Sequence, residues 1–152
     1  MTVKEITSAV QWNTFWESHG SNALFQSWLW SEVLVKRGEK IWRLGLYEGS
    51  TLVGIALVTL VAAKRGRFLH VRHGPILASW GMWREVVREL RALAARERVW
   101  FIRISPLVKE LPSDLGFNPS PIHAMDAEVC WVLDLDAPEE MLLANIRKTT
   151  RY

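Results

Sequence analysis

Basic side chains and histidines gather in one acid-free part of the sequence. No Asp or Glu occurs from Gly49 to Arg84. Within this stretch lie Lys64, Arg65, Arg67, His70, Arg72 and His73. Guanidinium and ammonium groups without neighbouring carboxylates favour phosphate groups. The pattern therefore points to a phosphate-bearing ligand, and a solvated basic face is the alternative that composition leaves open.

The segment Arg72-His73-Gly74-Pro75 ends a predicted strand and opens a turn. Loops at strand ends expose backbone N–H groups and often bind ligands. A structural Gly-Pro turn beside a surface arginine is the alternative. His73 could carry a proton, but the sequence pairs it with no carboxylate, so we assign it no catalytic role.

A second basic group, Arg147, Lys148 and Arg151, closes the sequence. A helix is predicted here, with Asp136 as its N-cap and Pro138 in its first turn. On such a helix Arg147 and Arg151 share one face. They could hold a phosphate there, or they could simply stabilise the C-terminal end of the helix.

Residues for metal or covalent chemistry are sparse. His19, His70 and His123 have no metal-ligand spacing, and no Ser-His-Asp arrangement can be argued. Cys130 is the only cysteine, which excludes an internal disulfide. It is predicted to be a buried, inert thiol in a strand. We therefore expect no metal site and no cofactor.

An antiparallel meander is predicted to position the first basic segment. Alternation at residues 42–47 predicts a strand, and residues 48–50 form a hairpin turn. A long strand follows at 51–63, rich in β-branched residues. A turn at 64–67 then leads into a third strand, Phe68–Arg72.

Helices are predicted before and after this meander. After a strand at 4–7, Ser8 caps a first helix that Gly20 ends. A second helix is predicted at 24–36, apolar nearly all round and hence well buried. Ser79 caps a third helix, whose apolar stripe is Trp80, Trp83, Val87, Leu90 and Ala94.

The remaining predicted elements are a strand at 99–104, a short helical turn at 115–117 and a strand at 128–135. The order of elements predicts an α+β domain with a mixed, mainly antiparallel central sheet flanked by helices. Of the 152 residues, 49% are apolar, enough for a core. The nine Trp are predicted to divide between that core and a cleft.

The sequence predicts a cytoplasmic protein. Its N-terminus, Met1–Glu5, lacks the charged-then-apolar layout of a signal peptide. The longest apolar run, Leu52–Ala63, is too short to span a bilayer. A single cysteine agrees with a reducing compartment.

The order of elements resembles an acetyltransferase-like (GNAT-like) fold, and more specifically the first of the two such domains in Fem-type aminoacyltransferases. The segments that carry the resemblance are Phe25-Gln26-Ser27-Trp28-Leu29-Trp30 with Lys36 and Gly38, Arg43–Tyr47 with Leu52-Val53-Gly54, His73-Gly74-Pro75-Ile76, and Asn145–Tyr152. The last is similar to the start of the family's "RKTTRYxIRKA". Each motif is common by itself, and the four together in this order are more specific.

The resemblance implies ester aminolysis in peptidoglycan synthesis. An amine of the cell-wall stem peptide attacks the aminoacyl ester at the tRNA 3′ end, and no metal is needed. The implied partners are aminoacyl-tRNA and a nucleotide- or lipid-linked peptidoglycan precursor. A lipid-linked acceptor would place the protein peripherally at the inner membrane face.

The implied substrate-binding residues are Gln26, Trp30, Lys36, Arg72, His73, Gly74, Pro75, Arg147, Lys148 and Arg151. By resemblance, Lys36 would contact the acceptor's phosphates, although a lysine at this position also stabilises its helix dipole. Trp30 would form a wall for a sugar or peptide, or belong to the core. The catalytic residues stay unassigned.

The resemblance also implies a domain division. Residues 1–137 form the first GNAT-like domain, and residues 138–152 begin a helix that leads into a second domain absent from this chain. We therefore expect the chain alone to be inactive.

Two other functions remain open from the sequence. One is an N-acetyltransferase that uses acyl-CoA, but such enzymes normally hold pyrophosphate with a Gly-rich turn at a helix N-terminus. The turn at residues 73–79 lacks that pattern. The other is a non-catalytic RNA-binding module that uses the basic and aromatic residues.

Overall fold

The computed structural model describes residues 1–64, 66–108, 116, 118 and 133–150. It divides into two compact units, Met1–Pro119 and Ser120–Tyr152. No helix among the described residues is long and apolar enough to cross a membrane.

The first unit is built on one mixed sheet. Its strands lie in the order β1 (Thr2–Glu5), β2 (Ile41–Glu48), β3 (Thr51–Ala63), β4 (Gly66–Arg72) and β6 (Phe101–Ser105). Strands β1 to β4 are each antiparallel to the next, and β6 runs parallel to β4. The short β5 (Ile76–Leu77) pairs with β3. The predicted meander and mixed sheet are confirmed, and the first strand lies two residues earlier than predicted.

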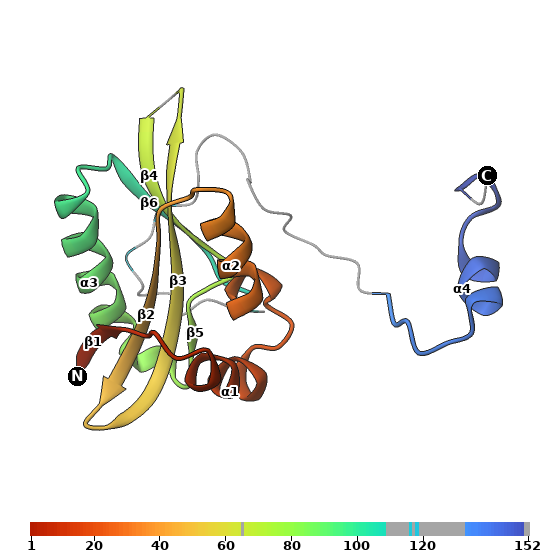
Figure 1. Cartoon of the computed structure of the whole chain (residues 1–152), viewed down its shortest axis with the longest axis horizontal. Helices are drawn as coiled ribbons and strands as arrows, with labels where there is room; N and C mark the ends of the chain where they lie inside the picture. The colour runs from red at the N-terminus through yellow and green to blue at the C-terminus, as the bar shows by residue number, and fades with distance from the viewer. Residues whose placement is uncertain (65, 109–115, 117, 119–132, 151–152) are drawn as a thin grey trace. The chain divides into compact units, whose positions relative to one another are not determined.

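Helices cover both faces of this sheet (Figure 1). The helix α3 (Trp83–Arg96) lies on one face, and α1 (Ala9–His19) and α2 (Trp28–Lys36) lie on the other. Successive strand residues point to opposite faces. On β3, Ala56 and Val58 therefore join the α3 core, whereas Ile55 and Leu57 join the core beneath α1 and α2.

The second predicted helix is broken in the structure. A 3-10 turn, Leu24–Gln26, precedes α2, and Ser27 between them caps α2 by accepting a hydrogen bond from Trp30 N (3.1 Å). The prediction that this helix is well buried is wrong. Leu29 is 72% exposed, and only one face of α2 packs on the sheet.

The third helix also begins later than predicted. Ser79 caps a 3-10 turn, Trp80–Met82, and α3 starts at Trp83. The predicted apolar stripe packs toward the core, but Val86 and Leu93 are buried more deeply than Val87 and Ala94.

The second unit corrects the prediction for the last helix. The helix α4 (Glu139–Asn145) has Pro138, not Asp136, at its N-cap. It ends before Arg147, because Ile146 is extended and a 3-10 turn, Lys148–Thr150, follows. Arg147 is therefore not on the helix. Arg151 lies outside the described residues.

Three further predictions fall mostly outside the described residues. Of the strand predicted at 128–135, only residues 133–135 are described, and they are not in a strand. Of the turn at 115–117, only Gly116 is described. His123 and Cys130 are also outside the described part.

A gap opens in the sheet where β3 changes partner. It pairs with β4 from Thr59 onward and with β5 at residues 54–55. The fully buried side chain of Gln26 lies in this gap. Its Oε1 accepts a hydrogen bond from Leu57 N (2.7 Å), and its Nε2 donates to the carbonyls of Leu57 (3.3 Å) and Arg72 (2.6 Å). A carboxamide has both a donor and an acceptor, so Gln26 replaces the missing strand neighbour.

Replacing Gln26 should destabilise the fold strongly. Gln26→Leu keeps most of the side-chain volume but leaves the Leu57 N–H buried without its acceptor. We expect a loss of about 2–5 kcal/mol in the free energy of unfolding, since each unsatisfied buried group costs about 1–3 kcal/mol. Urea unfolding measures it. Gln11→Leu on the exposed surface of α1 is the matched control, with an expected change within about 0.5 kcal/mol. If both variants lose the same free energy of unfolding, Gln26 does not act as the replacement for a strand neighbour.

Candidate functional site

The turn at residues 72–75 lies directly against Gln26. The Gly74–Pro75 bond is cis, and His73 has φ +52°, in the left-handed region. A Cβ added at Gly74 would overlap the Gln26 carboxamide, so glycine is required there. The backbone N–H of His73 donates to Ser105 Oγ at the end of β6 (3.4 Å). Gln26 and β6 together fix the position of this turn.

An arginine on β2 anchors the start of α2. Arg43 Nε donates to Ser31 Oγ (2.7 Å), and its guanidinium pairs with Glu32. The same guanidinium lies over the ring of Trp28, 4.0 Å from its centroid. Because these contacts fix the first turns of α2, they also fix Trp30 on the same helix.

Beside the turn lies a hollow of about 140 Å³, which we call the Arg72 pocket. Its polar and aromatic lining residues are Phe25, Trp30, Arg37, Glu39, Thr59, His70 and Arg72. The guanidinium carbon of Arg72 lies 3.5 Å from the centroid of the Phe25 ring. Trp30 meets Phe25 edge-on, with centroids 4.9 Å apart. At the rim, Arg37 pairs with Glu39 (3.2 Å).

A smaller hollow of about 80 Å³ lies on the other side of the turn, and we call it the His73 pocket. Its lining includes His19, Asn22, His73, Pro75 and Trp80. Phe25 connects the two hollows, because its ring also contacts the His73 ring edge-on (4.7 Å between centroids).

The Arg72 pocket has the chemistry of an anion site with an aromatic wall. Stacking on Phe25 fixes the plane of the Arg72 guanidinium, and a fixed guanidinium recognises phosphate or carboxylate through its edge. The ring of Trp30 offers an apolar surface to a sugar or a peptide beside that charge. The pocket can therefore hold a ligand that joins a phosphate to an organic group.

Six of the predicted site residues come together around this turn. Trp30 and Arg72 line the Arg72 pocket, and His73 and Pro75 line the His73 pocket. Gln26 is fully buried beneath Gly74. Its place in the structure is that of a support for the turn, not of a group that touches a ligand.

The other four predicted residues are not part of this cluster. Lys36 is exposed at the end of α2 and lines neither pocket, whereas its neighbour Arg37 does. Arg147 and Lys148 are exposed residues of the second unit. Arg151 is outside the described residues.

Sequence reasoning missed Phe25 and Arg37 as site residues. Phe25 stands next to Gln26 in the motif that carried the resemblance, and Arg37 follows Lys36. Adjacency was the only signal for either, because the stacking of Phe25 on Arg72 and the place of Arg37 in the pocket lining depend on tertiary structure.

A larger hollow of about 320 Å³ lies between α3 and β6. Its lining is apolar apart from Arg91, and no predicted site residue lies in it. Without convergent polar groups it is a weaker candidate than the Arg72 pocket.

Comparison with solved structures shows the fold. The structure titled "Crystal structure of FemX" is similar with a TM-score of 0.60 and 18% identity, over 71% of this chain and 28% of that chain. An aminoglycoside 6'-N-acetyltransferase, AAC(6')-IG from Acinetobacter haemolyticus, is similar with a TM-score of 0.55 and 14% identity, over 90% of this chain and 100% of that chain. The predicted GNAT-like α+β fold is confirmed.

Comparison of sequences identifies the family. No curated protein sequence matches the chain significantly. The model of the FemAB family matches residues 7–134, which is most of the chain. The chain spans 28% of the length of the FemX structure. From the extent of the family match we conclude that this chain belongs to the FemAB family.

Proposed function

We propose that this chain is the acceptor-binding half of an enzyme that transfers an amino acid from aminoacyl-tRNA to the stem peptide of a peptidoglycan precursor. The match of residues 7–134 to the FemAB family carries the proposal. The fold shared with the FemX structure agrees with it. Such a transfer builds the interpeptide bridge of the cell wall.

In this reaction the stem-peptide amine attacks the carbonyl carbon of the aminoacyl ester. An amide bond forms, the ester bond to the terminal ribose of the tRNA breaks, and a proton passes from the amine to the ribose oxygen. Because the ester is already activated, the enzyme must mainly align its substrates and stabilise the oxyanion. Both substrates carry phosphates, so cationic surfaces serve the alignment.

The Arg72 pocket is the proposed site for the phosphate-bearing part of the acceptor. Arg72 would face the phosphates, and Trp30 would contact the adjoining sugar. The basic segment that contains Arg72 has no acid from Gly49 to Arg84, and the carboxylate of Glu39 in the pocket lining is paired with Arg37. Lys36, one residue before the pocket-lining Arg37, would add a longer-range attraction.

Residues outside this pocket complete the proposal. We propose that Arg147, Lys148 and Arg151 also bind the acceptor's phosphates, next to a second domain. Because the chain spans 28% of the FemX structure, we expect transfer to need that further domain. Aminoacyl-tRNA is a cytoplasmic donor, so we place the reaction in the cytoplasm, at the inner membrane face if the acceptor is lipid-linked.

An acyl-CoA-dependent N-acetyltransferase is the second candidate. One observation favours it, namely that the chain matches the acetyltransferase structure over the whole of that chain. The absence of a Gly-rich pyrophosphate turn at residues 73–79 speaks against it.

Removal of the Arg72 guanidinium should weaken acceptor binding. Calorimetric titration of the chain with a nucleotide-linked muropeptide should give a Kd that Arg72→Ala raises about tenfold to a hundredfold, because a hydrogen bond to a charged group contributes about 1.5–3 kcal/mol. Arg84→Ala, an exposed arginine on the opposite face of the sheet, is the control and should bind like the wild type. Unchanged affinity in Arg72→Ala would remove this pocket from the proposal.

An assay of aminoacyl transfer and an assay of acetyl-CoA binding distinguish the two candidate functions. With aminoacyl-tRNA and muropeptide, mass spectrometry should detect an aminoacylated product when the proposed second domain is present and none with these 152 residues alone. Acetyl-CoA should leave the melting temperature of the chain unchanged. A true ligand at a hundred times its Kd would stabilise the fold by about 2.7 kcal/mol, so a clear thermal shift with acetyl-CoA would instead favour the acetyltransferase.

A further inference from the structure

Trp100 is the most exposed aromatic side chain of the described residues. It is 76% exposed and lies just before β6. Its backbone N–H donates to the carbonyl of Arg67 (2.8 Å). Gly66, with φ +122°, lies directly under the indole, where a Cβ would come within 2.6 Å of the ring. The glycine backbone supports one face of the ring, and much of the indole remains open to solvent.

Three cations lie near Trp100 along the chain or on the neighbouring hairpin. Lys64 and Arg67 come from the turn and first residues of the β3–β4 hairpin, and Arg98 lies two residues before Trp100; all three are exposed. We call these four residues the Trp100 patch. The sequence has no acid from 49 to 84 or from 98 to 109. The nearest acid in sequence, Glu97, pairs with Lys40 (2.6 Å). The patch therefore combines an exposed aromatic ring with basic, acid-free segments of the sequence.

We propose that the Trp100 patch binds unpaired nucleotides of an RNA. A base stacks on the open indole, and Lys64, Arg67 and Arg98 contact the flanking phosphates. A stacking ring within a cationic surface is how proteins hold single-stranded nucleic acid without reading its sequence. The ring is positioned before binding, because Gly66 and the hydrogen bond to Arg67 hold it in place.

The same chemistry could attract an anionic membrane, and the structure favours RNA. A membrane-binding surface buries several aliphatic or aromatic side chains side by side. Here the exposed hairpin residues next to the cations are Ala62 and Ala63. Phe101 is 43% exposed and lines the α3–β6 hollow with Trp100, but its ring is stacked on Phe68, with centroids 4.7 Å apart. A single supported indole suits one base better than a lipid layer.

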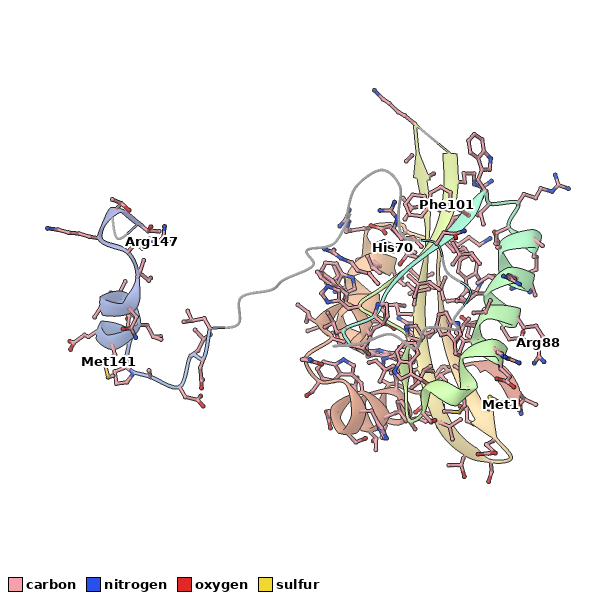
Figure 2. All side chains as sticks on the ribbon, turned by 180° about the vertical axis from the view of Figure 1, so that it is seen from behind. Met1, His70, Arg88, Phe101, Met141 and Arg147 are labelled. Atoms are coloured by element: carbon pink, nitrogen blue, oxygen red, sulfur yellow. The ribbon has the colours of Figure 1, made fainter. Side chains whose placement is uncertain are left out.

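The patch is separate from the pocket proposed for the acceptor. Trp100 lies beside the start of β4, whereas Arg72 ends that strand. Seven residues of strand span roughly 20 Å. Figure 2 shows Phe101 toward the end of the sheet where the β3–β4 hairpin turns, away from Arg88 on α3. The inference rests on the proposed function only for the identity of the RNA as the aminoacyl donor.

Fluorescence anisotropy with a labelled single-stranded RNA of about 12 nucleotides tests the patch on the full 152-residue chain. Trp100→Ala should raise the Kd about tenfold, and Trp100→Phe should recover most of the affinity, because a base also stacks on phenylalanine. The double variant Lys64→Ala/Arg67→Ala should make the slope of log K against the logarithm of salt concentration shallower by about 1.4. Each lost phosphate contact accounts for about 0.7 of that change.

The matched control is Arg84→Ala/Arg88→Ala, which removes two exposed cations of α3 and changes the net charge equally. It should leave the salt dependence unchanged. The proposal is overturned if Trp100→Ala binds RNA like the wild type. It is also overturned if the α3 control loses as much salt dependence as Lys64→Ala/Arg67→Ala, or if the chain binds anionic vesicles but not RNA. Should Trp100→Ala fail to fold, the two double variants alone decide. The RNA carries no aminoacyl ester, so loss of binding and loss of transfer are distinguishable.

Discussion

The carboxamide of Gln26 holds the sheet together at its weakest point. The strand β3 leaves β5 and joins β4 across a gap, and backbone groups left there would be buried without partners. The carboxamide of Gln26 forms hydrogen bonds with these groups. The backbone carbonyl of Gln26 in turn accepts a hydrogen bond from Trp12 Nε1 (2.8 Å). One residue thereby joins both strands to the segment between α1 and α2. The helical path of the chain breaks directly after Gln26, where Ser27 is extended and caps α2.

The proposed site follows from this arrangement. With Gln26 beneath it, Gly74 must lack a side chain, and the turn passes from Arg72 to β5 in one fixed path. The residue before Gln26 is Phe25, so its ring lies where it can stack on Arg72 and touch His73. The residue that seals the sheet thus places the aromatic ring that orients the arginine. The support of the fold and the orientation of the candidate site have the same physical cause.

The sequence predicts well what depends on short-range pattern. Alternation predicted the meander, and caps together with apolar residues predicted the three helices of the first unit. It failed where a tertiary contact decides. The break at Ser27 and the exposure of Leu29 follow from the inward turn of Gln26, which no local pattern shows. Phe25 and Arg37 were missed because the stacking of Phe25 on Arg72 and the place of Arg37 in the pocket lining are tertiary features. The role of Gln26 changed from expected ligand contact to support, because its burial cannot be read from its sequence neighbours.

Hydrogen exchange at the Leu57 amide tests the central claim most directly. Its hydrogen-bond acceptor is Oε1 of Gln26, a side chain and not a neighbouring strand. If Gln26 seals the gap, NMR should show this amide exchanging as slowly as the amides of Ala56 and Val58 in the buried middle of β3. Fast exchange at Leu57 between slowly exchanging neighbours would show that the gap opens on its own and would contradict the account.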